Sequence, residues 1–351
     1  MAPSSLTLNY DAILSTTLFN YRKTLEDAIS TANAFLYVLM KKNKNGYKKV
    51  SDIGDRMALP LMYELGNADS YSGYDVLDVT PADGITMAFF NWAQASVPIS
   101  ISGLEEKKNA GEAKLIDLLE SKTKQAELGL QEFFNKKMLQ GAGGSAITSP
   151  YTSPMNGSQF IDPLPLQVAY DPTTSTSIGN LNQSTYGWWR NQTKNSASTT
   201  FAGFLKELRN ARNNASKGPG GSPDLHLADQ ATAELYEASL AAAHRNPSYQ
   251  SADIPFDNVA FYGKPLTWDE FVADAANGSA TQSTTSGTWY MLNTQFWGIR
   301  VHSGTNFTPT PFIKPENQDA RTSHILWLGA MGVGNRRKQG VVGSIDTTIA
   351  S

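Results

Sequence analysis

The residues that most often carry chemistry are few and scattered in this sequence. Its four histidines, His226, His244, His302 and His324, include no i,i+3 or i,i+4 pair of the kind that binds zinc on a helix. Cysteine is absent, so disulfides, thiolate metal sites and cysteine nucleophiles are excluded. The G-x-S-x-G, H-E-x-x-H and Walker A motifs are also missing. We therefore expect no catalytic residues, no metal site and no cofactor.

The nearest match to a nucleotide-binding motif is Gly329-Ala-Met-Gly332-Val-Gly334, which follows the apolar run ILWLG. Arg337 stands where the third glycine of that motif belongs, and too few residues follow to form a βαβ unit. We interpret this segment as a glycine-rich turn between two strands.

Two short clusters have both a binding interpretation and a structural one. Trp188, Trp189 and Arg190 suit stacking against a sugar, but they are also typical of an aromatic core cluster with an arginine that fixes a loop. The Arg-Arg-Lys run at 336–338 suits either a weak phosphate contact or a polar turn. We favour the structural interpretation of both clusters.

Hydrophobic periodicity divides the first 140 residues into three parts. Helical spacing predicts one helix over residues 18–42 and another over residues 112–140. At 1.5 Å per residue the second helix is about 42 Å long, and a Ser102-x-x-Glu105 capping box precedes it. Between the helices, residues 44–102 alternate with period two. This pattern predicts an extended β-hairpin, which has little of its own to pack against.

The rest of the chain mixes helices with strands. Two more helices are expected, over residues 201–215 and 228–245. Four strands are expected, over residues 224–228, 256–263, 288–302 and 323–331. The predicted fold class is therefore α+β.

Charge is distributed unevenly over the first hundred residues. Residues 1–50 carry seven lysines and arginines against three acidic side chains, whereas residues 51–100 carry one against seven. Two solvated faces would account for this difference. An acidic hairpin that lies on a basic region of another copy of the chain would account for it as well.

The overall composition bounds the class of protein. A chain of 351 residues is long for one domain and suits two, and its net charge of −3 argues against a dedicated nucleic-acid binder. No apolar run approaches the roughly 18 residues of a transmembrane helix, and no secretory signal opens the chain. We expect a soluble, cytoplasmic protein.

Five stretches of the sequence together carry a resemblance to a known family. They are residues 6–29, residues 70–119, YGWWRNQT at 186–193, PDLHLADQATAELYEASL at 223–240, and residues 289–302 with 317–342. In this order they resemble the N-terminal arm, the extended loop running into a spine helix, the start and the middle of an axial domain, and the closing strands of the major capsid proteins of tailed bacteriophages, which have the Hong Kong 97-type fold. The tract AANGSATQSTTSGT at 275–288 departs from the family pattern.

The resemblance implies a Hong Kong 97-type α+β fold divided into five segments. These are the N-terminal arm and helix (1–43), the extended loop (44–102), the spine helix of the peripheral domain (103–140), the axial domain with part of the peripheral sheet (141–300), and the C-terminal return strands (301–351).

The resemblance also implies a role in a virion. The chain would be a non-enzymatic major head protein, assembled in the host bacterial cytoplasm as hexamers and pentamers into an icosahedral shell around double-stranded DNA. Its partners would be further copies of itself, a portal protein, a decoration protein and non-specifically contacted DNA, without any membrane. Because the sequence starts at Met1, we expect a separate scaffolding protein and not a fused scaffold segment.

We expect ten residues to lie at contacts between subunits: Asp75, Asp78, Phe89, Phe90, Trp92, Arg22, Lys41, Lys42, Lys49 and Arg190. Some relatives join subunits through a lysine–asparagine isopeptide bond with the lysine on the extended loop, but residues 50–106 contain no lysine. Two alternative functions stay open. One is an encapsulin-like nanocompartment shell that encloses an enzyme, and the other is a carbohydrate-binding or hydrolytic protein built around Trp188 and Trp189.

Overall fold

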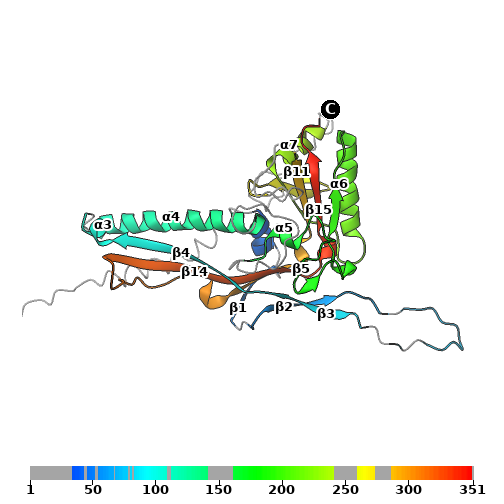
Figure 1. The fold of residues 1–351 in the computed structure, drawn as a ribbon, viewed down its shortest axis with the longest axis horizontal. Helices are drawn as coiled ribbons and strands as arrows, with labels where there is room; N and C mark the ends of the chain where they lie inside the picture. The colour runs from blue at the N-terminus through cyan, green and yellow to red at the C-terminus, as the bar shows by residue number, and fades with distance from the viewer. Residues whose placement is uncertain are drawn as a thin grey trace, which may run out of the picture.

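The computed structural model describes residues 34–42, 46–51, 54–66, 68–77, 80, 83–108, 112–140, 161–240, 259–272 and 286–349. Two sheets form the body of the molecule: an elongated layer under one long helix, and a more compact unit beside it (Figure 1). A narrow hairpin projects away from both. The mixture of helices and strands confirms the predicted α+β class.

The elongated layer is a five-stranded sheet. It contains β1 (Tyr47–Val50), β12 (Trp297–His302), β14 (Ala320–Val333) and β13 (Thr308–Pro309), with β4 (Ala93–Ser102) along the other edge of β14. A short 3₁₀ turn, η5 (Ser303–Thr305), follows β12. The long helix α4 (Glu112–Leu139) runs above β4 and β14 (Figure 1). Its 28 residues confirm the predicted helix over residues 112–140.

Strand β4 lies within the predicted hairpin of residues 44–102, but it pairs with β14 of the main sheet. It is antiparallel to β14 over its whole length, from Ala93 opposite Gly329 to Ser102 opposite Ala320. The buried side of β4 faces the core under α4 and consists of Ala93, Ala95, Ile99 and Ile101, while the residues between them are exposed or only partly buried. Assigning residues 93–102 to the hairpin was therefore wrong, because their apolar face is buried by α4 within the same subunit.

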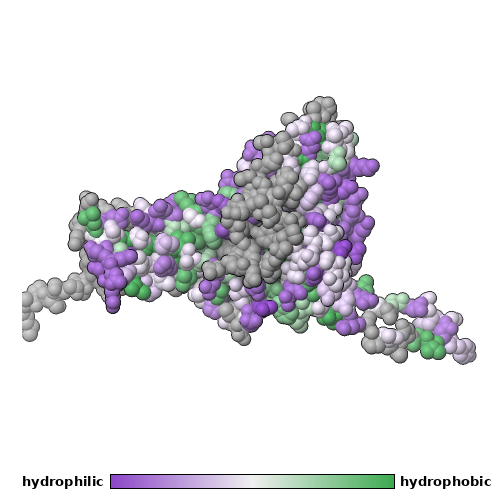
Figure 2. Space-filling model, viewed as in Figure 1, coloured by the Kyte–Doolittle hydropathy of each residue, from purple (hydrophilic) through white to green (hydrophobic). Residues whose placement is uncertain are grey.

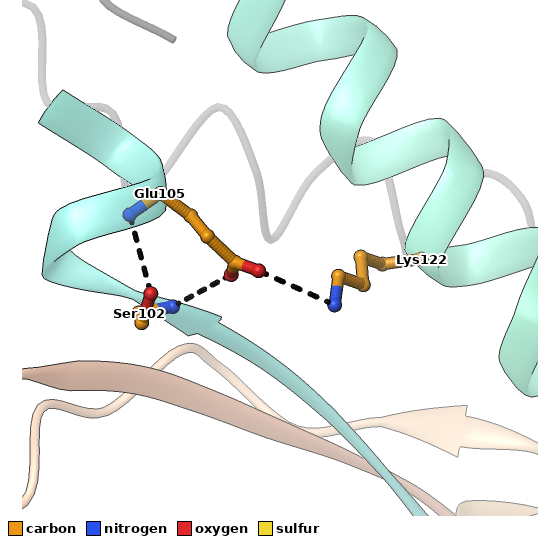
Figure 3. A network of polar contacts seen from close by, with 3 residues as sticks. All are labelled: Ser102, Glu105 and Lys122. Carbon is orange, nitrogen blue, oxygen red and sulfur yellow. Dashed lines mark hydrogen bonds and ion pairs between the residues drawn. The ribbon is translucent and has the colours of Figure 1, made fainter. Parts of the chain in front are cut away.

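The predicted capping box joins β4 to the helices that follow. The backbone N–H of Ser102 donates to Glu105 Oε2 (3.1 Å), and the N–H of Glu105 donates to Ser102 Oγ (3.2 Å), at the start of α3 (Gly103–Lys108) (Figure 3). Glu105 Oε1 also lies 3.8 Å from Lys122 Nζ on α4. The hydrogen bond from Ser102, helped by Lys122, lowers the pKa of Glu105. The contact between Glu105 and Lys122 links α4 to the end of β4.

The second sheet has six strands. In spatial order they are β7 (Gln192–Asn195), β15 (Gly340–Asp346), β11 (Ser286–Leu292), β8 (Leu225–Ala228), β10 (Lys264–Trp268) and β9 (Val259–Phe261). Helices α6 (Phe201–Ser216) and α7 (Gln230–Ser239) cover one face, where they pack on Trp289 and Met291 of β11. The alternate residues Tyr290 and Leu292 face the other way, into the core that includes α4. The two sheets thus share one hydrophobic core.

Two predicted elements have different bounds in the structure. The predicted strand over 288–302 is two strands, β11 and β12, separated by the 3₁₀ turn η4 (Thr294–Phe296), and they belong to different sheets. The predicted helix over 228–245 begins later, because Ala228 ends β8 and Asp229 is the N-cap of α7. Residues 241–258 lie outside the described part of the chain.

A buried polar contact links the end of α4 to the second sheet. Asn135 Nδ2 donates to both carboxylate oxygens of Asp269, at 3.1 and 3.0 Å, just after β10. Burial raises the pKa of Asp269 even though it accepts these hydrogen bonds. The contact fixes how the long helix meets the six-stranded sheet.

The remaining elements are short. Helix α2 (Ala34–Tyr37) continues into the π-helical turn η1 (Val38–Lys42), where Leu36 and Leu39 are buried. The rest of the helix predicted over residues 18–42 lies outside the described residues. Helix α5 (Leu164–Gln167), strands β5 (Ser177–Ile178) and β6 (Leu181–Asn182), and the 3₁₀ turns η2 (Gly187–Trp189) and η6 (Arg336–Lys338) complete the fold. Among the described residues no helix is long and apolar enough to cross a membrane.

The glycine-rich segment at 329–334 is not the turn that we predicted. Gly329 and Gly332 lie inside β14 and pair with residues of β12. A Cβ at Gly332 would lie 2.5 Å from two ring carbons of Phe90 and 2.9 Å from Met57 Cε. Glycine is needed there because side chains of the hairpin pack directly on the backbone of β14.

We expect Gly332→Ala to destabilise the subunit by about 1–3 kcal/mol, because the added methyl group overpacks the contact with Phe90. Thermal unfolding of the two proteins measures this difference. Gly334→Ala is the matched control, since its Cβ would meet only the Phe296 carbonyl oxygen at 3.6 Å. Equal losses of stability in the two variants would contradict the packing account.

Candidate assembly interface

The projecting hairpin consists of β2 (Met57–Met62) and β3 (Ile85–Phe90), joined by a long connection. Much of its apolar surface is uncovered; Figure 2 shows hydrophobic residues at its far end. Tyr74 and Val76 are 104% and 98% exposed, so they contact almost nothing in their own subunit. We define the hairpin patch as the residues of this hairpin that are more than half exposed and strongly apolar: Met62, Leu65, Tyr71, Tyr74, Val76, Leu77, Ile85 and Met87.

Local hydrogen bonds shape the far end of the hairpin. The N–H of Asp75 donates to the Ser72 carbonyl oxygen, and the N–H of Ser72 donates to Asp75 Oδ2, both at 2.8 Å. Asp75 is exposed, as expected for a contact residue, but its carboxylate also stabilises this turn. No lysine or arginine occurs between Met57 and Ser102, so the hairpin is both acidic and apolar. A large exposed apolar patch on a folded subunit is typical of an interaction site.

The base of the hairpin, in contrast, is packed within the subunit. Met57, Leu61, Ala88 and Phe90 form a buried cluster with Trp189 and other residues of the main body. Phe90 was expected to lie at a contact between subunits, but it is only 1% exposed because its own subunit already buries the ring. The ring is buried because it packs over Gly332.

Two further contacts anchor the base. The N–H of Phe89 donates to the Gly179 carbonyl oxygen at 3.0 Å. The ring of Tyr63 stacks on Trp188, with centroids 4.8 Å apart and planes 19° apart. Phe89 itself is 38% exposed and stays a predicted contact residue. The hairpin therefore has a base held by its own subunit and a far end that is not.

This division predicts a gradient of hydrogen exchange. In isolated subunits we expect the amides of residues 57–62 and 85–90 to be protected, because they pair with each other and pack on the body. The amides of residues 68–77 should exchange quickly in isolated subunits and become protected only on assembly. Fast exchange at the base, or no change at residues 68–77 between the two forms, would contradict this division.

The other predicted contact residues have varied settings. Lys41 and Lys49 are exposed, on η1 and β1. Trp92 is partly buried, and its Nε1 donates to the Gly54 carbonyl oxygen at 2.9 Å. Arg22 and Asp78 lie outside the described residues, as does the side chain of Lys42. Pairing between the acidic hairpin and these lysines stays a prediction.

The structural interpretation of the Trp-Trp-Arg cluster is confirmed. Trp189 is 1% exposed and its Nε1 donates to the Ile178 carbonyl oxygen, while Trp188 lies between Tyr63 and Trp189. Arg190 donates to the carbonyl oxygens of Gln183 and Ser184, both at 2.7 Å. This arginine fixes a loop of its own subunit, and its role at an interface stays a prediction. A sugar cannot stack on the Trp188 face that Tyr63 covers.

The run at 336–338 was only partly understood from the sequence. It is a turn, but Arg336 and Lys338 are 0% and 2% exposed, so it is not a solvated polar turn. Both side chains donate several hydrogen bonds to other parts of the chain. No sequence pattern distinguishes a buried Arg-Arg-Lys run from an exposed one.

No metal or proton-transfer site emerges from the described residues. They contain no group of three or more His, Asp or Glu side chains that could hold a metal ion. His226 is buried against the rings of Phe261 and Trp289, and burial lowers its pKa to about 3. His302 Nδ1 lies 3.1 Å from Thr305 Oγ1, His324 is exposed on β14, and His244 lies outside the described residues.

No protein-family model matches the sequence, and no curated protein matches it. Solved structures do match. The capsid asymmetric unit of cyanophage A-1(L) superposes with a TM-score of 0.55 at 12% identity, over 87% of this chain and 92% of that one. The capsid of an empty GTA particle gives 0.53 at 7% identity, over 85% and 93%. This chain has the Hong Kong 97-type capsid fold.

The Hong Kong 97-type fold also occurs in a third match, the SrpI encapsulin of Synechococcus elongatus PCC 7942. That chain gives a TM-score of 0.50 at 10% identity, over 87% of this chain and 86% of that one. Because all these identities are low, what is shared is the arrangement of the elements and not individual residues. The resemblance read from the sequence is confirmed at the level of the fold.

Proposed function

We propose that this chain is the major capsid protein of a tailed bacteriophage, assembling as hexamers and pentamers into an icosahedral shell around double-stranded DNA. The observation that carries the proposal is the hairpin patch, which sits on a capsid fold and has no cover within its own subunit. Burying a large apolar side chain contributes roughly 1.5–3 kcal/mol, so a second copy that covers several side chains of the hairpin patch would be bound with a large favourable free energy. Most copies in a shell would make this contact through their hairpin patch, so the same free energy of burial stabilises the shell at each contact.

In this proposal the segments of the chain take the roles that the resemblance implies. Residues 103–140 contain the spine helix, residues 141–300 the axial domain with part of the peripheral sheet, and residues 301–351 the return strands. The extended loop was predicted over residues 44–102, and in this proposal it is the projecting hairpin within that span, since β1 and β4 at its two ends belong to the five-stranded sheet. Residues 1–43 are the arm and first helix. Further copies of the chain are its main partners, with a portal protein, a separate scaffolding protein, a decoration protein and packaged DNA. Its location is the virion, after assembly in the bacterial cytoplasm.

An encapsulin-like shell is the second candidate, because the SrpI encapsulin shares the fold at a similar identity. The contents of the particle separate the two candidates. Particles isolated from the native source should contain nuclease-protected double-stranded DNA of one length if the chain is a phage capsid protein. Particles that hold a co-purifying enzyme and no DNA would favour the encapsulin function, and the absence of particles would count against both.

A further inference from the structure

The hairpin leaves the subunit over a small shelf, residues 177–190, which contains β5, β6 and η2. Gly179 and Asn180 have φ angles of 60° and 67°, as in the two-residue turn of a tight hairpin. The shelf holds the hairpin through the Gly179 carbonyl oxygen and the Trp188 ring. A Cβ at Gly179 would lie 2.8 Å from the Cβ of Ala88, so the two backbones are in close contact. The position of the shelf therefore sets the direction of the hairpin.

The shelf has little regular structure with which to hold its own shape. Each of its strands has two residues, and its 3₁₀ turn has three. Beneath it lies the fully buried side chain of Arg336. Its Nε donates to the Gln167 carbonyl oxygen (2.8 Å), and its Nη1 donates to the Trp189 carbonyl oxygen (3.0 Å). Its Nη2 donates to Gln183 Oε1 and Asn191 Oδ1, each at 3.0 Å.

These four acceptors are neutral, and no hydrogen bond from Arg336 to a carboxylate occurs among the described residues. The guanidinium also lies 5.6 Å from the centroid of the Trp189 ring. Burial lowers the pKa of Arg336 to about 9, so the side chain is charged at neutral pH. Burying a charge is costly, and an apolar side chain could fill the same volume. What an apolar side chain cannot do is hold four acceptors in the fixed plane of a guanidinium.

We propose that Arg336 is a positioning residue for assembly: by joining residues 167, 183, 189 and 191 it fixes the shelf, and through the shelf the direction of the hairpin. The consequence for the shell rests on the proposed function. The effect on the hairpin is a property of a single subunit and can be measured without a shell.

Lys338 provides a matched control from the same turn. Its Nζ donates to the carbonyl oxygens of Lys217 (3.0 Å), Gly218 (2.9 Å) and Gly221 (3.3 Å), beyond the end of α6, and to none of the shelf. Arg336→Met and Lys338→Met each remove one buried cation from η6. Both should destabilise the subunit, but only the first removes support from the shelf.

The chain has no cysteine, so two introduced cysteines can carry spin labels without interference. We place them at Ser70 on the hairpin and Asn213 on α6, both exposed, and measure the distance between the labels by pulsed electron paramagnetic resonance in unassembled subunits. The labelled protein without further substitution and its Lys338→Met variant should give the same distribution of distances between the labels. Arg336→Met should broaden or shift it, and so should Arg336→Lys, which keeps the charge but lacks the fork of donors.

If Arg336→Met does not fold, Gln183→Leu removes one acceptor of the shelf and should broaden the distribution in the same direction. Distributions for the Arg336 and Gln183 variants that coincide with that of Lys338→Met would overturn the proposal. In assembly trials we expect Lys338→Met to form normal closed particles and Arg336→Met to form few or misshapen ones. If the unchanged protein forms no particles even when it is produced together with its neighbouring genes, the proposed function fails, while the label distances still decide the role of Arg336.

Discussion

The double substitution Tyr74→Ser and Val76→Ser should abolish the assembly of closed particles while leaving the unfolding temperature of the isolated subunit unchanged. Both side chains are almost fully exposed, so the folded subunit loses no packing when they are shortened. If a neighbouring copy covers them, each contact loses roughly 3–6 kcal/mol for the two side chains together. That corresponds to a factor of about 10² to 10⁴ in the association constant. Electron microscopy and analytical ultracentrifugation measure the yield of particles.

Ser70→Ala is the control for this experiment. It alters the same end of the hairpin without removing apolar surface, since only the backbone N–H of Ser70 is used, in a hydrogen bond to Asp69 Oδ1. We expect this variant to assemble normally. Normal particles from the double variant as well would show that the far end of the hairpin is not an essential contact.

Assembled particles boiled in SDS without a reducing agent should run as a single band at the subunit mass of 38.1 kDa. The chain has no cysteine for disulfides, and no lysine from Val50 to Glu106, so the hairpin has no amine for an isopeptide bond. The shell must then be held by non-covalent contacts such as those of the hairpin patch. A ladder of covalent oligomers on the gel would show that another lysine, outside the hairpin, forms cross-links.

Much of the fold follows from local patterns in the sequence. The spacing of apolar residues predicted the long helix almost to its bounds, and the capping box at Ser102 and Glu105 forms as expected. Such features depend on residues three or four positions apart, whose contacts are fixed once the helix forms.

The errors concern contacts between distant segments. Period two correctly indicated that residues 93–102 form a strand, but it cannot tell which strand lies beside it; β14 begins more than 200 residues later. Gly332 was wrongly predicted to be a turn residue. Glycine is required at this position because the ring of Phe90, more than 200 residues earlier in the chain, packs on it. The burial of Arg336 depends on four acceptors from residues 167–191, which no local pattern reveals.

The candidate interface was predicted in outline only. The excess of acidic over basic residues at 51–100 pointed to the hairpin, and the structure adds the exposed apolar residues of the hairpin patch. Its division into an anchored base and an uncovered far end needed the contacts of Tyr63, Phe89 and Phe90 with the body of the subunit. Those contacts move the expected interface away from Phe90 and toward Tyr74 and Val76.

The most direct test of the central claim is a cryo-electron microscopy reconstruction of the purified chain, produced alone and together with its neighbouring genes. We expect closed icosahedral shells of hexamers and pentamers in at least one preparation, with the hairpin patch of each subunit lying on another copy. A monodisperse 38.1 kDa monomer in both preparations, or shells in which Tyr74 and Val76 stay in contact with solvent, would contradict the account.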